Sequence, residues 1–154
     1  LAPFVGSITG VDSSKGMLEV MEQKIKDLSF KNVRCGYLDI TRGGKLTEKY
    51  DVIVSGMTLH HIEDLQAIFR TFCDSLTNGG YLAIADLDKE DGSFHGDNTG
   101  IFHFGFEKKE LERYFQDAGF SVIYHGAATE IQKPGQDGRI KTFGISLTIG
   151  VKNR

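Results

Sequence analysis

Short, mostly apolar runs alternate along this chain with longer segments in which apolar residues recur every three or four positions. The run DVIVS at 51–55 is typical of a strand that is covered on both faces of a sheet. Six such runs predict strands at 5–11, 32–40, 51–55, 81–87, 121–125 and 141–151.

The segments with helical spacing predict three helices, at 15–28, 64–76 and 107–118. Ser13 or Ser14 can cap the first helix, and Gly119 suits the position just after the third. Strands that alternate with helices predict an α/β fold with a mostly parallel sheet.

Two connections depart from this alternation. Residues 88–106 are polar, rich in Gly and His, and longer than most loops, so we expect them to cover a substrate. Residues 130–139 contain Pro134-Gly135 and Asp137-Gly138 and predict a turn. A short turn there makes the last two strands an antiparallel hairpin.

The composition is that of an ordinary globular protein, with 154 residues, 40% hydrophobic and 25% charged. This length predicts one domain over residues 1–154. The net charge of −3 and the lack of a long basic run argue against nucleic acid as a partner. No apolar run approaches the roughly 20 residues of a membrane span. Cys35 and Cys73 lie in apolar segments and predict reduced, buried thiols in a cytoplasmic protein.

Acidic residues end the first two predicted strands, Asp12 the first and Asp39 the second. In an open α/β sheet, ligands bind at the carboxyl ends of the strands. Two carboxylates one strand apart suit a ribose and a hydrogen-donating base. The spacing therefore predicts a nucleoside cofactor.

Five segments follow one another in a characteristic order: GVDSSKGML, YLDI, YDVIVSGMTLHHIED, LTNGGYLAIAD and GFEKKELERYFQDAGF. This order resembles the class I S-adenosylmethionine-dependent methyltransferases, in particular the small-molecule branch that includes the ubiquinone and menaquinone methyltransferases. The resemblance covers about residues 1–125, and each segment alone would be a weak signal.

The resemblance implies a Rossmann-like three-layer sandwich whose seven strands have the order 3-2-1-4-5-7-6, with strand 7 antiparallel. The six predicted strands match strands 2 to 7, whereas strand 1 and its glycine-rich turn have no counterpart. Residues 1–4 resemble the end of the helix that follows that turn. We therefore expect a methyltransferase domain that is truncated at its N-terminus.

The missing strand leaves unpaired backbone groups on its two neighbours, which is costly. Apart from truncation, another segment or a partner chain can fill the gap, or the strands at 5–11 and 51–55 can pair directly. The open sheet also allows self-association.

The resemblance implies roles for residues that follow the first three predicted strands. Asp12 would accept hydrogen bonds from the ribose hydroxyls, Asp39 from the adenine amino group, and the Ile40 N–H would bond a ring nitrogen. Structural alternatives exist: a helix cap for Asp12, a core position for Met17 and a tight turn at Gly56. The expected cofactor-binding residues are Asp12, Ser13, Met17, Leu38, Asp39, Ile40, Ser55, Gly56 and Met57.

His60 and His61 lie where the resemblance places the acceptor and the sulfonium. Either could accept a proton from an oxygen nucleophile, with His61 favoured by the family pattern. The alternative is a first-turn helix residue that bonds the backbone. Asp86 and Asp88 either lie near the acceptor or are solvated loop residues. The acceptor pocket can also involve loop side chains, namely His95, Phe102, His103 and Phe104.

The histidines also suggest a zinc-binding site. The candidate ligands are His60, His61, His95, Asp97 and His103. Their spacing matches no compact metal motif, so the sequence predicts no metal.

The sequence thus predicts transfer of a methyl group from S-adenosylmethionine to a small-molecule acceptor by in-line displacement. Such a reaction is accelerated mainly by alignment and exclusion of water, which explains the lack of a catalytic triad. Two alternatives stay open: a nicotinamide-dependent oxidoreductase, because an acidic residue ending the second of the family's strands also suits its ribose, and a non-catalytic remnant that acts as a binding module. The acceptor and the type of atom methylated are not defined by the sequence.

Overall fold

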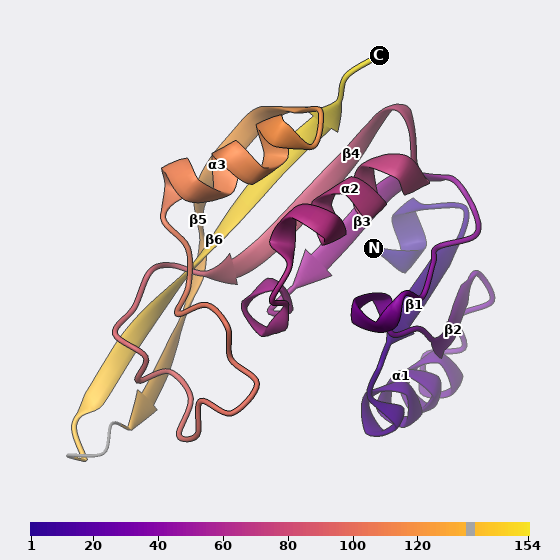
Figure 1. Cartoon of the computed structure of the whole chain (residues 1–154). Coiled ribbons are helices and arrows are strands. Elements are labelled where there is room, and N and C mark those ends of the chain that lie inside the picture. Colours follow the sequence, from indigo (N-terminus) through magenta and orange to yellow (C-terminus); the bar gives the residue numbers. More distant parts are fainter. Residues whose placement is uncertain (135–137) are drawn as a thin grey trace. The chain divides into compact units, whose positions relative to one another are not determined.

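The computed structural model describes residues 1–134 and 138–154, which fold as two units, Leu1–Lys45 and Leu46–Arg154. The described strands form two sheets, and each unit contains one of them (Figure 1). The strands predicted at 5–11 and 51–55 belong to different sheets of the described residues, so the alternative that they pair directly is wrong. A single domain over residues 1–154 stays a prediction.

Unit 1 is a two-stranded parallel sheet with one long helix. Its elements are η1 (Ala2–Phe4), β1 (Ile8–Asp12), α1 (Lys15–Asp27), β2 (Val33–Tyr37) and η2 (Ile40–Arg42). Ser14 is the cap of α1, because its hydroxyl accepts from the N–H of Met17. Asn32 donates from its side-chain amide to the carbonyls of Ala2 and Val5. Val5 thus lies in a bend directly after η1, and β1 begins at Ile8 rather than at the predicted residue 5.

Most apolar residues of unit 1 are only partly covered. Ala2 is its one fully buried hydrophobic residue, whereas Met17 is 54% and Leu28 is 61% exposed. Two strands and one helix provide too little surface to enclose a core. The apolar stripe predicted for α1 is therefore real but incompletely packed.

Unit 2 is a four-stranded sheet with the order β3-β4-β6-β5. β3 and β4 are parallel, and β6 is antiparallel to both β4 and β5. This is the 4-5-7-6 part of the predicted order, and the predicted Rossmann-like sheet with its C-terminal hairpin is confirmed. Figure 1 shows α2 and α3 on one face of the sheet. The elements are β3 (Tyr50–Gly56), η3 (Leu59–His61), α2 (Leu65–Ser75), β4 (Leu76–Leu87), α3 (Lys108–Asp117), β5 (Phe120–Pro134) and β6 (Ile140–Lys152).

Aromatic side chains fill the core between the helices and the sheet of unit 2. Phe69 of α2 is fully buried, and its ring lies 5.1 Å from that of Phe115 and 5.7 Å from that of Tyr114. Phe115 in turn contacts Phe120 at the start of β5, with the ring centroids 5.7 Å apart. The apolar residues whose spacing predicted helices at 64–76 and 107–118 therefore form their buried faces.

Two strand boundaries differ from the sequence prediction. β4 begins at Leu76 rather than at residue 81, and Gly79 with φ +78° allows an irregularity there. Tyr50 lies opposite Leu76 while Val52 lies opposite Tyr81, so β4 carries the extra residues.

β5 extends to Pro134 instead of ending at residue 125. It pairs with β6 along this whole length, so its backbone is satisfied although many of its side chains are polar and exposed. The turn predicted at 130–139 is therefore shorter, and residues 135–137 lie outside the described residues.

Replacement of Phe69 by Ala tests the packing of unit 2. We expect Phe69→Ala to lower the free energy of unfolding by about 3–5 kcal/mol, because it leaves a cavity among packed rings. Urea unfolding followed by circular dichroism measures this change. The control is Phe102→Ala, whose ring is 51% exposed, and we expect an effect within about 0.5 kcal/mol. Equal effects of the two substitutions would contradict the assignment of Phe69 to the core.

Candidate functional site

The carboxyl ends of β1 and β2 bring together the acidic residues that the sequence singled out in unit 1. Asp12 is the last residue of β1, and its Oδ1 accepts from the N–H of Ser14 at 2.8 Å. The carbonyl of Asp12 accepts from the N–H of Leu38 at 3.1 Å. Because Asp39 follows Leu38, both acidic residues lie at the same end of this small sheet.

Asp39 lies two residues beyond β2, not at its end, and it caps η2. Its Oδ1 accepts from the hydroxyl of Thr41 at 2.6 Å and from the N–H groups of Thr41 and Arg42. The pKa of Asp39 is below its ordinary value, mainly because the Thr41 hydroxyl donates to it. The N–H and the positive charge of Arg42 lower this pKa further. Oδ2 lies 3.5 Å from Nε of Arg42. A carboxylate offers about four lone-pair sites, so Asp39 keeps acceptor capacity beyond its capping role.

Met17 lies in the first turn of α1 and is 54% exposed, so it is not a core residue. This removes the structural alternative that the sequence left open for it. Ser13 is also exposed, between Asp12 and the helix cap, whereas Leu38 and Ile40 are half-buried.

In unit 2, the chain leaves β3 through a strained residue. Met57 has φ +53°, a left-handed conformation that costs a non-glycine residue about 1–2 kcal/mol. Its N–H donates to the carbonyl of Ala85 at 2.8 Å, which helps to hold this conformation. Ser55 pairs with Ile84. A Cβ at Gly56 would meet no atom within 4 Å, so packing within the chain does not require a glycine there.

Asp86 is a buried carboxylate that joins the ends of β3 and β4. Its Oδ2 accepts from the N–H groups of Thr58 at 3.1 Å and Leu59 at 2.8 Å. Its Oδ1 accepts from the N–H of Leu87 at 2.8 Å and lies 2.6 Å from Nδ1 of His60. The position of these donors fixes the segment that carries the two adjacent histidines.

The sequence alternative of solvated carboxylates at 86 and 88 is wrong. Asp86 is only 3% exposed. Asp88 is half-buried, accepts from the hydroxyl of Ser146, and donates its N–H to Gly144 at 2.9 Å. A signal for Asp86 was present in the sequence, because an acidic residue interrupts the apolar run AIADL.

His60 and His61 have different environments although they are neighbours. They lie in η3, a separate turn before α2, and not in the first turn of that helix as expected. His60 is 1% exposed and pairs with Asp86, whereas His61 is exposed and its Nδ1 lies 3.3 Å from the carbonyl of Gly100. Burial of His60 was not predicted and makes direct contact with an acceptor harder for it than for His61.

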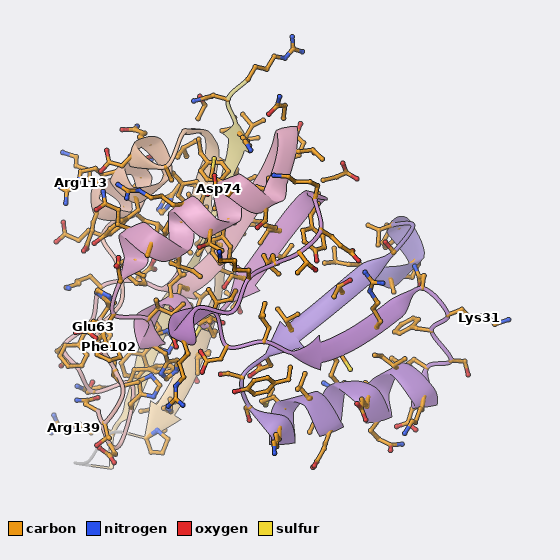
Figure 2. All side chains as sticks on the ribbon, turned by 45° about the vertical axis from the view of Figure 1, so that its right-hand side comes forward. Lys31, Glu63, Asp74, Phe102, Arg113 and Arg139 are labelled. Atoms are coloured by element: carbon orange, nitrogen blue, oxygen red, sulfur yellow. The ribbon has the colours of Figure 1, made fainter. Side chains whose placement is uncertain are left out.

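The long connection 88–106 folds back onto η3. The carbonyl of His60 accepts from the N–H groups of Phe102 at 3.0 Å and His103 at 3.2 Å. Nε2 of His103 lies 2.9 Å from the carbonyl of Ile62. Phe102, labelled in Figure 2, is 51% exposed and Phe104 is 38% exposed. The loop is thus anchored beside the histidines, and part of its aromatic surface faces solvent.

The same loop brings His95 to the pair. Its ring centroid lies 5.2 Å from that of His60 and 5.5 Å from that of His61. Burial lowers the pKa of His95, and the neighbouring charges of His60, His61 and Lys133 lower it further. Its Nε2 is buried and has no hydrogen-bond partner within the part of the chain that the structure describes. Asp97, another residue considered for zinc, instead accepts from the N–H and hydroxyl of Thr99.

A separate surface depression lies between the start of α2 and α3. It contains none of the residues that the sequence predicted for the site. Its lining consists of Glu63, Asp64, Leu65, Gln66, Arg113, Tyr114 and Asp117.

Comparison with known proteins identifies the family. The family described as "Methyltransferase domain" matches residues 2–119. An uncharacterized methyltransferase of Schizosaccharomyces pombe is 29% identical over 136 residues, which cover 79% of this chain and 48% of that protein. The demethylmenaquinone methyltransferase of Listeria welshimeri is 24% identical over 144 residues, covering 77% of this chain and 61% of that protein. The chain therefore spans about half of the length of these curated relatives.

A solved structure supports the fold. The crystal structure of a putative methyltransferase from Bacillus halodurans has a TM-score of 0.77 at 15% identity, and covers 99% of this chain and 86% of that chain. The order of strands in each sheet agrees with the class that the sequence motifs resemble. The chain belongs to the methyltransferase domain family, within the class I S-adenosylmethionine-dependent methyltransferases.

Proposed function

We propose that this chain transfers a methyl group from S-adenosylmethionine to a small-molecule acceptor. The observation that carries the proposal is the pair of acidic residues at one end of the β1-β2 sheet, Asp12 and Asp39, in a chain of this family. The sulfonium of the cofactor supplies an electrophilic methyl carbon. An acceptor atom attacks this carbon in line with the departing sulfur, and the chain contributes alignment and exclusion of water.

Unit 1 supplies the adenosine-binding residues in this proposal. Asp12 accepts from the ribose hydroxyls, and the lone pairs of Asp39 that do not cap η2 accept from the adenine amino group. The Ile40 N–H, at the start of η2, donates to a ring nitrogen, because the first N–H groups of a helix lack partners within it. Met17 and Leu38 flank the adenine ring. Ser13 is the residue after Asp12, which contacts the ribose.

In unit 2, Ser55, Gly56 and Met57 keep the role that the family resemblance gives them at the cofactor. The open space around Gly56 supports this, since a close approach by a ligand would explain a glycine that internal packing does not require. The left-handed Met57 fixes the course of the backbone just after it.

Among the histidines, we assign proton acceptance to His61 and a positioning role to His60. His61 is exposed, and its Nδ1 faces the carbonyl of Gly100. A carbonyl only accepts hydrogen bonds, so Nδ1 carries the proton and Nε2 keeps a lone pair. His60 is buried against Asp86 and holds the turn. Asp86, His95, Phe102, His103 and Phe104 then shape the surroundings of the acceptor.

Location and partners are further proposals. No described helix has the length and apolar composition of a membrane span. Cys35 and Cys73 are free and half-buried, which is less buried than predicted, and burial raises the pKa of Cys73. Free thiols favour a cytoplasmic protein. We propose that nucleic acid is not a partner, and that self-association occurs through open strand edges.

Substitution of Asp12 or Asp39 by Asn tests the adenosine contacts. Asn retains a side-chain oxygen for the local backbone hydrogen bonds, but it loses the charge and one acceptor. We expect each variant to weaken S-adenosylmethionine binding about 10–100-fold, because hydrogen bonds to charged groups contribute about 1.5–3 kcal/mol. Isothermal titration calorimetry on the full chain measures the affinity.

The control for this test is Asp27→Asn on the exposed end of α1, which we expect to bind like the unaltered chain. The dinucleotide NAD is titrated in parallel. Binding of NAD in preference to S-adenosylmethionine would reject the methyltransferase proposal in favour of an oxidoreductase.

Substitution of His61 by Gln tests proton acceptance. We expect kcat to fall about 10²–10⁴-fold with a hydroxyl acceptor, whose proton must leave, and to change little with an unprotonated amine. Formation of S-adenosylhomocysteine is followed with phenols, small amines and demethylmenaquinone, the last suggested by the name of one relative. His125→Gln is the control, since its ring bonds the Thr148 hydroxyl in the hairpin. An unchanged kcat on a hydroxyl acceptor would refute the role of His61.

A further inference from the structure

His60, His61 and His95 each place one ring nitrogen within 4.8 Å of the others, all inside unit 2. Nitrogen ligands of a tetrahedral zinc site, at Zn–N distances of 2.0–2.1 Å, lie about 3.3 Å apart. The three side chains therefore need to approach by at most about 1.5 Å to share one ion. We propose that these imidazoles bind a divalent transition-metal ion of the zinc type, with a fourth position open to water or another ligand.

Hydrogen bonds fix the orientation of two of the three rings. Nδ1 of His60 lies 2.6 Å from Oδ1 of Asp86, and Nδ1 of His61 lies 3.3 Å from the carbonyl of Gly100. In both cases Nδ1 donates, which leaves the lone pair of Nε2 for a metal. A histidine that donates its other ring N–H to a carboxylate or a backbone carbonyl is the usual arrangement around a bound metal.

The third ring has a nitrogen that lacks a partner. Nε2 of His95 is buried and makes no hydrogen bond among the described residues. Buried polar atoms in proteins are nearly always satisfied, so an orphan atom requires an explanation. A bond to a metal ion shared with His60 and His61 would provide that partner.

The fixed charges nearby suit a cation. Asp86 lies against His60, and the carboxylate of Glu90 accepts from the N–H of Phe94, the residue before His95. The opposing charge is Lys133, whose ammonium donates to the carbonyl of Phe94 at 2.6 Å and lies 4.1 Å from the centre of its ring. Two carboxylates against one ammonium leave a net negative surrounding for a divalent ion.

The main-chain contacts also hold the three ligands in place without a metal. Asp86 fixes the turn that carries His60 and His61, and the His60 carbonyl anchors Phe102 and His103 of the loop that carries His95. Preorganised side chains favour binding, because little motion is lost when the ion enters.

This inference does not depend on the proposed methyl transfer. A coordinated His61 cannot accept a proton, because the metal uses the same lone pair. In a metal-loaded chain, a hydroxyl acceptor bound at the fourth position would instead lose its proton more easily, as zinc-bound water does.

Metal titration of the full chain without an affinity tag tests the proposal. After treatment with a chelator and dialysis, we expect one zinc per chain by elemental analysis, and visible absorption bands of a tetrahedral site with Co²⁺. His61→Ala and His95→Ala should each weaken zinc binding by at least about 100-fold, more than the 10–100-fold typical for loss of a group outside the coordination sphere. The test avoids His60, whose burial makes it part of the core.

The matched controls are the two histidines outside the cluster, replaced in His103→Gln and His125→Gln, which should bind zinc as tightly as the unaltered chain. Circular dichroism confirms that each variant is folded. A folded chain that takes up no stoichiometric zinc, or equal affinity in His61→Ala and the controls, overturns the metal site. Zinc binding without S-adenosylmethionine binding would leave this inference standing and contradict the proposed function instead.

Discussion

The buried carboxylate of Asp86 is the interaction on which the arrangement of unit 2 depends. A charge that is only 3% exposed is costly unless its lone pairs are used, and Asp86 uses them on backbone N–H groups and one imidazole. These partners come from η3 with its preceding residue Thr58 and from β4 itself. One side chain therefore fixes where the chain goes after β3, and with it the position of both adjacent histidines.

The long loop after β4 depends on the same turn. Its residues bond the carbonyls of His60 and Ile62, while its other side is held by Lys133 and Lys141 of the hairpin. Lys141 donates to Asp91 and to the hydroxyl of Ser93. Hydrogen bonds from the Ser93 side chain and then from Lys141 lower the pKa of Asp91 to about 2. The unusual length of β5 and β6 thus has a structural consequence, because their far ends supply the cations that hold the loop.

In unit 1, the two carboxylates that we propose to bind the cofactor also make local hydrogen bonds. Asp12 and Asp39 both satisfy backbone N–H groups at the start of a following turn or helix. These local bonds explain why an acidic residue follows each strand even when no ligand is bound. A carboxylate nevertheless has more acceptor sites than these bonds use. The two explanations are therefore compatible.

The sequence by itself determined which segments form the helices and which face of α2 is buried, because apolar periodicity is a local property of the chain. The order of the strands came only from the resemblance of five ordered segments to a known family. The sequence prediction was wrong where the pairing of strands determines the structure. The polar residues of β5 form a strand because β6 supplies their backbone hydrogen bonds. The spacing of His60, His61 and His95 along the chain also argued against a shared metal site, and the sequence left open whether Asp86 lies near the acceptor or in solvent. Only the tertiary structure brought these side chains together, because a folded loop placed His95 beside a turn distant in the sequence, and burial in an otherwise apolar strand end gave Asp86 its partners.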